Sequence, residues 1–286
     1  MGNKYKLLSQ IIPLFPRNIG TFYDLFAGSG TMSLNVRANK YVMNDLSNHL
    51  YNLYDMFKKY NSDEIISYCE QNATKYGFSR DLTDKPKIAE HNREPYYKCR
   101  EDMNNNPSTL GFYFLTFYSF CNQFRFNNGN YNMPVGNGYF KEESKYLIKN
   151  FSDFLHNDNV HIFCKSYDEF TDFEDNSFCY FDIPYSNTCA VYNNKGEING
   201  WNEKSDLNFF KYCEKLNSIG IKWAVSNVFE NKGKVNEHLI RWCEKNKWIV
   251  YHLDAKYAGH SYEFANSKTD EVLICNYAEN RSSRLF

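Results

Sequence analysis

The sequence is 286 residues long, with 42% hydrophobic and 23% charged residues and a formal net charge of −1. This length allows one large domain or a domain with a sizeable insertion, and the apolar content is ample for a core. A chain so close to neutral is not globally basic, so any contact with nucleic acid must come from a local basic face. No apolar stretch approaches the roughly 20 residues that a membrane span needs.

The nine cysteines include no CxxC pair and no zinc-type spacing with histidine. The chain begins without an apolar signal segment. These features indicate reduced, mostly buried thiols in a cytoplasmic protein, with no metal site and no membrane partner.

The first part of the chain predicts a βαβ unit. After a short helical start, the pattern indicates a buried strand, a helix and a second strand, over residues 21–26, 31–38 and 40–43. Gly28 and Gly30 precede the helix, and Asp45 follows the second strand. Nucleotide-binding folds place a glycine turn and an acidic residue at these positions.

A helical region then interrupts the α/β pattern. Apolar spacing is helical over residues 46–76, residues 77–109 are polar, and an aromatic helix is expected over residues 110–120. We expect the aromatic stripe of that helix to be core rather than a base-stacking surface. The Asn128-Gly129 pair predicts a hairpin turn.

The α/β pattern resumes near residue 151. One further helix is expected at residues 205–219, and strands are expected at residues 160–164, 178–181, 223–226, 249–253 and 271–276. The predicted fold class is therefore α/β, with a Rossmann-like sheet domain made of residues 1–58 and 151–286. A mainly helical insertion that carries a hairpin, residues 59–150, interrupts this domain.

The glycine turn after the first strand is a candidate cofactor loop. Glycines let the backbone turn tightly and approach a ligand closely, and Asp45 can accept hydrogen bonds from ribose hydroxyls. Ser33 stands where a dinucleotide-binding loop has its third glycine, which favours a nucleoside cofactor without pyrophosphate. A dinucleotide-binding domain and a simple βα turn without a ligand are the alternatives.

A second candidate site follows the strand at residues 178–181. The tetrapeptide Asp182-Ile183-Pro184-Tyr185 places a carboxylate, a proline-stiffened turn and an aromatic ring at the carboxyl edge of the sheet. Asp182 and the Ile183 carbonyl can accept both hydrogens of a ring amine, and Tyr185 can stack on the base that carries it. The alternative is an ordinary turn that ends a strand.

Taken together, these motifs resemble those of the Dam-type (α group) adenine-N6 DNA methyltransferases over almost the whole chain. The resemblance rests on Gly2-Asn3-Lys4-Tyr5, Asp24-Leu25-Phe26-Ala27-Gly28-Ser29-Gly30, Asn44-Asp45, Phe124-Arg125-Phe126-Asn127, Asn132-Met133-Pro134-Val135-Gly136, Ser166-Tyr167, Asp182-Ile183-Pro184-Tyr185, Ala224-Val225-Ser226-Asn227-Val228 and Glu271-Val272-Leu273-Ile274-Cys275-Asn276-Tyr277. The order of cofactor loop, insertion and catalytic loop is that of the α group, in which the insertion recognises the target sequence.

The resemblance implies S-adenosyl-L-methionine as cofactor and duplex DNA as partner, in a prokaryotic or phage-infected cell. It implies direct in-line methyl transfer to adenine N6 after base flipping, by a protein that we expect to be monomeric. The implied catalytic residues are Asp182, Ile183, Pro184 and Tyr185. The implied cofactor contacts are Lys4, Tyr5, Phe26, Ala27, Gly28, Ser29, Gly30, Asp45, Tyr167 and Asp182. The implied DNA contacts are Asn122, Gln123, Arg125 and Asn132.

Ile183 departs from the family pattern, which has proline there; the carbonyl is kept but the loop is less rigid. The recognition sequence is left open, because Cys121 stands where Dam has an asparagine. The alternatives are an N4-cytosine methyltransferase, whose catalytic loop usually begins with serine, and a glutamine methyltransferase, whose loop usually begins with asparagine. A fourth reading is a catalytically weak or inactive DNA-binding relative.

Overall fold

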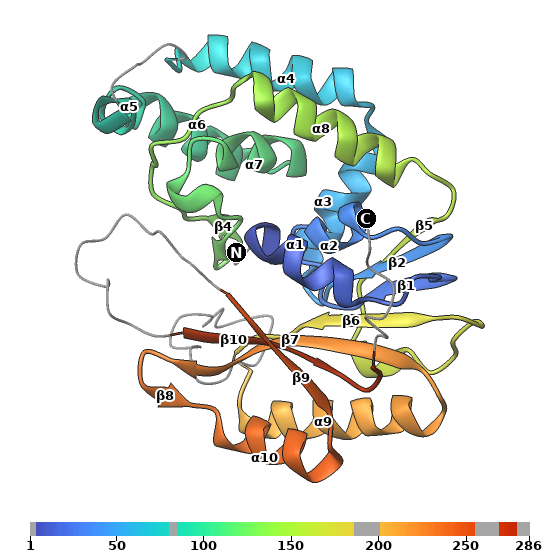
Figure 1. Cartoon of the computed structure of the whole chain (residues 1–286). Helices are drawn as coiled ribbons and strands as arrows, with labels where there is room; N and C mark the ends of the chain where they lie inside the picture. The colour runs from blue at the N-terminus through green and yellow to red at the C-terminus, as the bar shows by residue number, and fades with distance from the viewer. Residues whose placement is uncertain (1–3, 80–84, 186–200, 255–268, 279–286) are drawn as a thin grey trace. The chain divides into compact units, whose positions relative to one another are not determined.

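The computed structural model describes residues 4–79, 85–185, 201–254 and 269–278. These residues form two compact units. Residues 47–162 make up a mainly helical unit, and the described residues before 47 and after 162 make up a unit built on a sheet (Figure 1).

The sheet unit has a parallel centre and an antiparallel edge. In spatial order its strands are β2 (Lys40–Asn44), β1 (Thr21–Asp24), β6 (Phe178–Asp182), β7 (Lys222–Asn231), β10 (Thr269–Cys275) and β9 (Ile249–Leu253). Strands β2, β1, β6 and β7 run parallel, whereas β10 runs antiparallel between β7 and β9. The short β8 (Lys234–Val235) pairs with β7, and β5 (Val160–Phe163) follows β2 in the strand order. This topology confirms the predicted Rossmann-like class.

Both faces of the sheet are covered, which explains why the central strands are apolar throughout. One face packs against α9 (Glu203–Ser218) and α10 (Glu237–Asn246), and the other against α1 (Leu8–Ile11) and α2 (Thr31–Asn35). Figure 1 shows these helices on opposite faces of the sheet. Two 3₁₀ turns, η1 (Lys4–Leu7) and η2 (Ile12–Leu14), flank α1. A third, η4 (Tyr167–Glu169), precedes β6.

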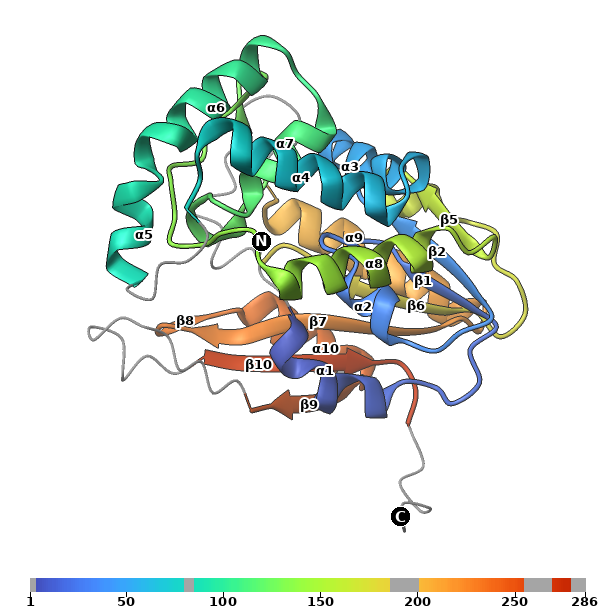
Figure 2. The same ribbon diagram turned by 90° about the horizontal axis from the view of Figure 1, so that it is seen from above.

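The helical unit packs its helices around buried aromatic side chains, and Figure 2 shows these helices from above. Its helices are α3 (Asn48–Lys59), α4 (Ser62–Tyr76), α5 (Lys85–His91), α6 (Arg93–Asn105), α7 (Thr109–Thr116) and α8 (Glu142–Leu155). After α7 come the 3₁₀ turn η3 (Phe120–Asn122) and the hairpin of β3 (Phe126–Asn127) and β4 (Asn130–Tyr131). The hairpin turn was predicted correctly, because Asn128 and Gly129 both have left-handed backbone, with φ of 49° and 77°.

Several elements differ from the sequence prediction. The aromatic helix ends at Thr116 rather than at residue 120, so Phe120 lies outside it with 56% of its surface exposed. Helix α2 ends at Asn35, three residues earlier than expected. Helices α5 and α6 occupy the stretch expected only to be polar, and α8 and α10 were not predicted.

Two general features follow from the described residues. Six of the eight described cysteines are buried, and none forms a disulfide with another described cysteine. In the described part of the chain, no helix combines the length and the apolar character that crossing a membrane requires.

Candidate active site

The glycine loop and the Asp182 loop leave the same edge of the sheet. Strands β1 and β6 are parallel neighbours, with Asp24 opposite Tyr180, so their carboxyl ends lie side by side. The Leu25 N–H continues the pairing by donating to the Tyr180 carbonyl at 3.3 Å. The two motifs that are far apart in the sequence therefore meet at the edge where open α/β sheets bind ligands.

The glycine loop is held by the end of the neighbouring strand β2. The Gly28 N–H donates to the Asp45 carboxylate (3.0 Å), and the Ala27 N–H donates to the Asn44 carbonyl (2.9 Å). Gly28 and Gly30 have φ of 55° and 71°, the left-handed region that favours glycine. Asn44 also donates from its side chain to the carbonyls of Leu25 and Lys165. Asn44 thus fixes the loop, a role that no local sequence pattern indicates.

Behind the loop lies a buried carboxylate. The Ser33 hydroxyl donates to the Asp24 carboxylate at 2.8 Å, and Asp24 is 1% exposed. Ser33 therefore replaces the third glycine of a dinucleotide loop with a hydrogen-bond donor. Burial raises the pKa of Asp24 to about 7, against the bond from Ser33, and the charges of Asp182 and Asp45 add to the rise.

Four charged or polar groups meet beside the catalytic loop. The Lys4 ammonium, in η1, lies 3.2 Å from the Asp182 carboxylate and 3.6 Å from that of Glu271, in β10. It also donates to the Tyr185 hydroxyl and lies 4.8 Å from the centre of the Tyr185 ring. The Tyr185 hydroxyl donates to Glu271 at 3.2 Å. Lys4, an expected cofactor contact, lies beside Asp182 and Tyr185 of the second candidate loop.

This arrangement follows from the alternation of side chains along the strands. Tyr180 of β6 and Leu273 of β10 face α1, so Asp182 and Glu271, two residues away from each, face it too. That face is also where η1 brings Lys4. Glu271 belongs to a segment that resembles the family, but it was not predicted to be a site residue, because no local pattern indicates that it meets Lys4.

Burial and charge oppose each other in this cluster. Burial raises the pKa of both Asp182 and Glu271, and the Lys4 ammonium offsets part of the rise. Burial alone would lower the pKa of Lys4, but the nearby carboxylates outweigh it and raise that pKa. The side chains of Lys4, Asp182 and Glu271 are 9%, 25% and 5% exposed, so Asp182 is the one that keeps substantial access to solvent.

Ile183 has a second role that the motif does not reveal. Its side chain is 1% exposed and belongs to the core cluster on the face of α9 and α10. The residue therefore anchors the loop by packing where proline would anchor it by restricting the backbone. Pro184 and Tyr185, which follow it, are half-buried.

The remaining expected cofactor residues differ in how close they lie to the glycine loop. The rings of Phe26 and Tyr167 lie 5.5 Å apart, both half-buried. The Ser29 hydroxyl lies 2.8 Å from that of Thr31 at the start of α2, and Tyr5 is 68% exposed. Phe26 and Tyr167 thus form a pair beside the loop, whereas Tyr5 points away from the core.

The expected DNA-contacting residues lie around the hairpin of the helical unit. The Arg125 guanidinium donates to the Asn132 side chain at 3.0 Å, which joins the two flanks of the hairpin. The Asn122 amide donates to the Thr116 carbonyl, and its backbone is left-handed with φ of 50°. The Gln123 carbonyl accepts from Tyr131 at 2.7 Å. Arg125 and Asn132 are brought together, while Asn122 is used to shape its own loop.

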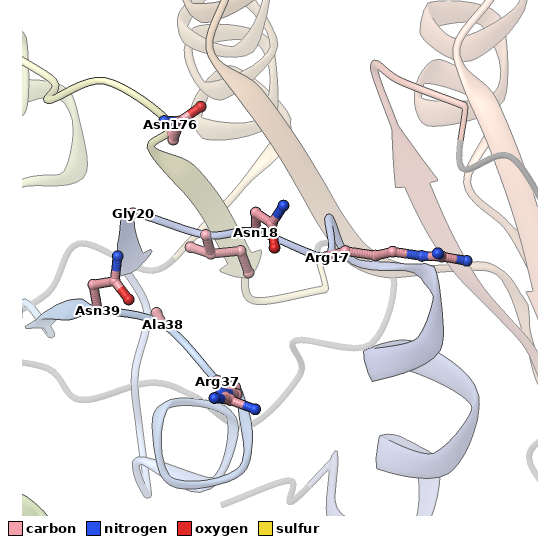
Figure 3. A pocket seen from close by; sticks show the side chains of 8 residues that line it. Arg17, Asn18, Gly20, Arg37, Ala38, Asn39 and Asn176 are labelled. Carbon is pink, nitrogen blue, oxygen red and sulfur yellow. The ribbon is translucent and has the colours of Figure 1, made fainter.

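A cavity of about 460 Å³ lies at the opposite edge of the sheet, where β1 and β2 begin. Figure 3 shows Arg17, Arg37, Asn39 and Asn176 around it. Because ligands of such sheets bind at the carboxyl ends of the strands, this cavity is not the candidate active site. Among the residues that the structure describes, no group of acidic, histidine or cysteine side chains is arranged to hold a metal ion.

An α/β sheet with a glycine loop and an acidic loop at one carboxyl edge is typical of proteins that bind a nucleotide or nucleoside cofactor. A sequence model of the family described as D12 class N6 adenine-specific DNA methyltransferase matches residues 1–271. The chain therefore belongs to this family, which confirms the resemblance to Dam-type enzymes.

Three relatives illustrate the similarity. The Type II methyltransferase M.FokI of Planomicrobium okeanokoites is 35% identical over 97% of this chain and 42% of its own length. The modification methylase StsI of Streptococcus sanguinis is 33% identical over the same shares. The DNA adenine methylase of Escherichia coli strain K12 is 28% identical over 67% of this chain and 65% of its own. The chain thus spans about two fifths of the length of the first two relatives.

Proposed function

We propose that this chain transfers a methyl group from S-adenosylmethionine to N6 of adenine in duplex DNA, at a specific sequence. The observation that carries the proposal is the position of Asp182, a partly exposed carboxylate beside the glycine loop. Family membership supports the same chemistry. M.FokI and StsI are more than twice as long as this chain, so the activity of this chain by itself needs a direct test.

The residues at the sheet edge suit this cofactor. Asp182 and Glu271 lie within 3.6 Å of one ammonium, that of Lys4, and the charges of Asp182 and Asp45 act on the buried carboxyl group of Asp24. S-adenosylmethionine, when bound, supplies an activated methyl group on a sulfonium and carries a second positive charge on its ammonium. A site with excess negative charge favours such a ligand over one with a pyrophosphate. We assign Asp45 to the ribose and the Phe26–Tyr167 pair to the adenine.

The catalytic loop supplies hydrogen-bond acceptors and a stacking surface. Asp182 and the Ile183 carbonyl accept the two hydrogens of the target amine, which directs its lone pair toward the methyl group. Tyr185 stacks on the extruded base, a contact worth about 1–3 kcal/mol, similar to the few kcal/mol that flipping costs. The Tyr185 hydroxyl accepts from Lys4 and donates to Glu271, and these bonds hold the ring beside Asp182.

We assign target recognition to the helical region of residues 59–150. Its hairpin carries Arg125, and a guanidinium can bond bidentately to guanine in the major groove or grip a phosphate. The bonds to Asn132 hold the guanidinium in one orientation, which lowers the entropy cost of a specific contact. We assign Asn122 and Gln123 to the same DNA-reading segment through their place in the loop that precedes the hairpin.

Transfer of a tritiated methyl group from S-adenosylmethionine to unmethylated duplex DNA tests the proposal. We expect incorporation with the wild-type chain and none with Asp182→Ala, whose folding can be checked by circular dichroism. DNA binding without incorporation by the wild-type chain would instead indicate an inactive DNA-binding relative. Incorporation that is unchanged in Asp182→Ala would refute the assigned mechanism.

A further inference from the structure

Three half-buried aromatic rings, rather than two, flank the glycine loop. Trp201, which precedes α9, lies 5.7 Å from Phe26 with the rings nearly perpendicular, and 6.2 Å from Tyr167. All three rings rest on the buried ring of Phe209. They are partly exposed on the same side of the core cluster, so they form one apolar wall beside the loop. Trp201 was not among the residues that the sequence analysis selected.

The orientation of Trp201 is fixed by a buried carboxylate. The indole N–H donates to one Asp206 oxygen at 2.6 Å, and the other oxygen lies 2.7 Å from His238 Nε2, in α10. Asp206 is 2% exposed. A buried carboxylate is costly unless hydrogen bonds satisfy it, and here each oxygen has its own donor.

Asp206 is not needed as a helix cap. Asn202 already caps α9 by accepting the N–H of Ser205, and it forms a reciprocal capping box with that residue. A carboxylate one residue further on adds nothing to this cap, because its two oxygens point to side chains. Its contacts instead join the indole to α10.

We propose that Asp206 is a positioning residue that holds the Trp201 ring against Phe26 and thereby sets affinity for the adenine of the cofactor. The inference rests on the proposed function, because it takes a nucleoside cofactor as the ligand. Fixing the ring before binding reduces the entropy that binding would otherwise cost. The effect should appear in cofactor affinity and not in the transfer step, since the hydrogen bonds of Asp206 and the ring contacts of Trp201 lead to His238, Phe26 and Phe209 rather than to Asp182 or Tyr185.

The chain provides a matched control in the same helix. Glu214, near the end of α9, accepts the indole N–H of Trp242 at 3.0 Å. Trp242 stacks on Phe210 and Trp223, neither of which belongs to the glycine loop. Glu214→Ala therefore removes a carboxylate–indole bond of the same kind without touching Phe26.

The test measures the dissociation constant of S-adenosylhomocysteine by titration calorimetry, together with kcat at saturating cofactor and DNA. We expect Asp206→Ala to weaken binding about tenfold, the effect of one hydrogen bond to a charged group, with kcat within about twofold of wild type. Asp206→Asn should recover most of the affinity, because its amide oxygen can accept the indole N–H. Glu214→Ala, which removes the indole acceptor in the same way, should bind as wild type does.

A double substitution decides whether Asp206 acts through Trp201. In Trp201→Phe, which lacks the N–H, the further change Asp206→Ala should have no additional effect on affinity. An equal loss in both backgrounds, a wild-type affinity in Asp206→Ala, or a wild-type affinity in Trp201→Phe would each overturn the inference. If Asp206→Ala does not fold, the single variant Trp201→Phe still gives the last of these outcomes. Absence of binding by the wild-type chain would refute the proposed cofactor instead.

Discussion

Replacing Lys4 by methionine should destabilise the fold, because it removes the cation from two carboxylates. At 3.2 and 3.6 Å, with an effective dielectric constant of about 20, each attraction is worth roughly 5 kcal/mol before desolvation. Methionine keeps most of the packing of the lysine stem. Since Asp182 is 25% exposed and water screens it, we expect Lys4→Met to lower the free energy of unfolding by about 2–4 kcal/mol at neutral pH.

Urea denaturation, followed by circular dichroism, measures this loss, and a double-mutant cycle locates it. In a Glu271→Gln background, Lys4→Met should lower the free energy of unfolding by about 1–2 kcal/mol less, because only the Asp182 carboxylate is then left without its cation. Lys40→Met is a matched control, since Lys40 pairs with Glu174 at the surface and should lose less than about 1 kcal/mol.

The stability lost in Lys4→Met should depend on pH, and the pKa shifts of the two carboxyl groups give the direction. Burial already raises the pKa of Asp182 and Glu271 above their ordinary values of 3.8 and 4.5, and removing Lys4 raises it further. A carboxyl group whose pKa is raised in the folded protein destabilises it as pH rises above the ordinary value. The deficit of Lys4→Met should therefore be complete at neutral pH and shrink as pH falls toward about 4. A loss below about 0.5 kcal/mol, or the same loss in both backgrounds, would refute this account.

Four further outcomes are expected. Asp182→Ala should abolish methyl transfer while the protein stays folded, as methyl-transfer assays and circular dichroism can show. Ile183→Pro should retain transfer but lower stability by about 1–3 kcal/mol in urea denaturation, because the buried side chain is lost. Arg125→Ala should lower DNA methylation without changing cofactor affinity. A relaxed sequence preference at one base pair would indicate that Arg125 reads a base. A uniform loss of DNA affinity, with a weaker dependence of that affinity on salt concentration, would indicate a phosphate contact. Asp24→Asn should stabilise the protein by roughly 2 kcal/mol at pH 8 and less as pH falls from 7 toward 3.8, since the buried carboxyl is protonated there.

The sheet and the meeting of the two loops were predictable because parallel strands align their carboxyl ends. Once residues 21–26 and 178–181 were identified as buried strands, the glycine loop and Asp182 had to leave the same edge. The hairpin turn at Asn128-Gly129 was predictable from the two residues alone, since both tolerate left-handed backbone.

Contacts between distant segments were not predictable. Lys4 and Glu271 meet only because β10 inserts antiparallel beside β7, which places Glu271 on the face that η1 covers. The bond between Trp201 and Asp206 depends on how the chain enters α9. Helix α6 was not predicted because its buried face is narrow. Only Tyr96, Cys99 and Met103 are buried, at helical spacing in an otherwise polar segment.

The most direct test of the proposed activity is the identity of the methylated base. Plasmid DNA from a methylation-deficient host that expresses this chain can be digested to nucleosides and analysed by mass spectrometry, with an Asp182→Ala strain beside it. We predict N6-methyladenine in the first strain and none in the second. N4-methylcytosine in its place, or no modified base from a folded chain that binds both DNA and S-adenosylmethionine, would contradict the account.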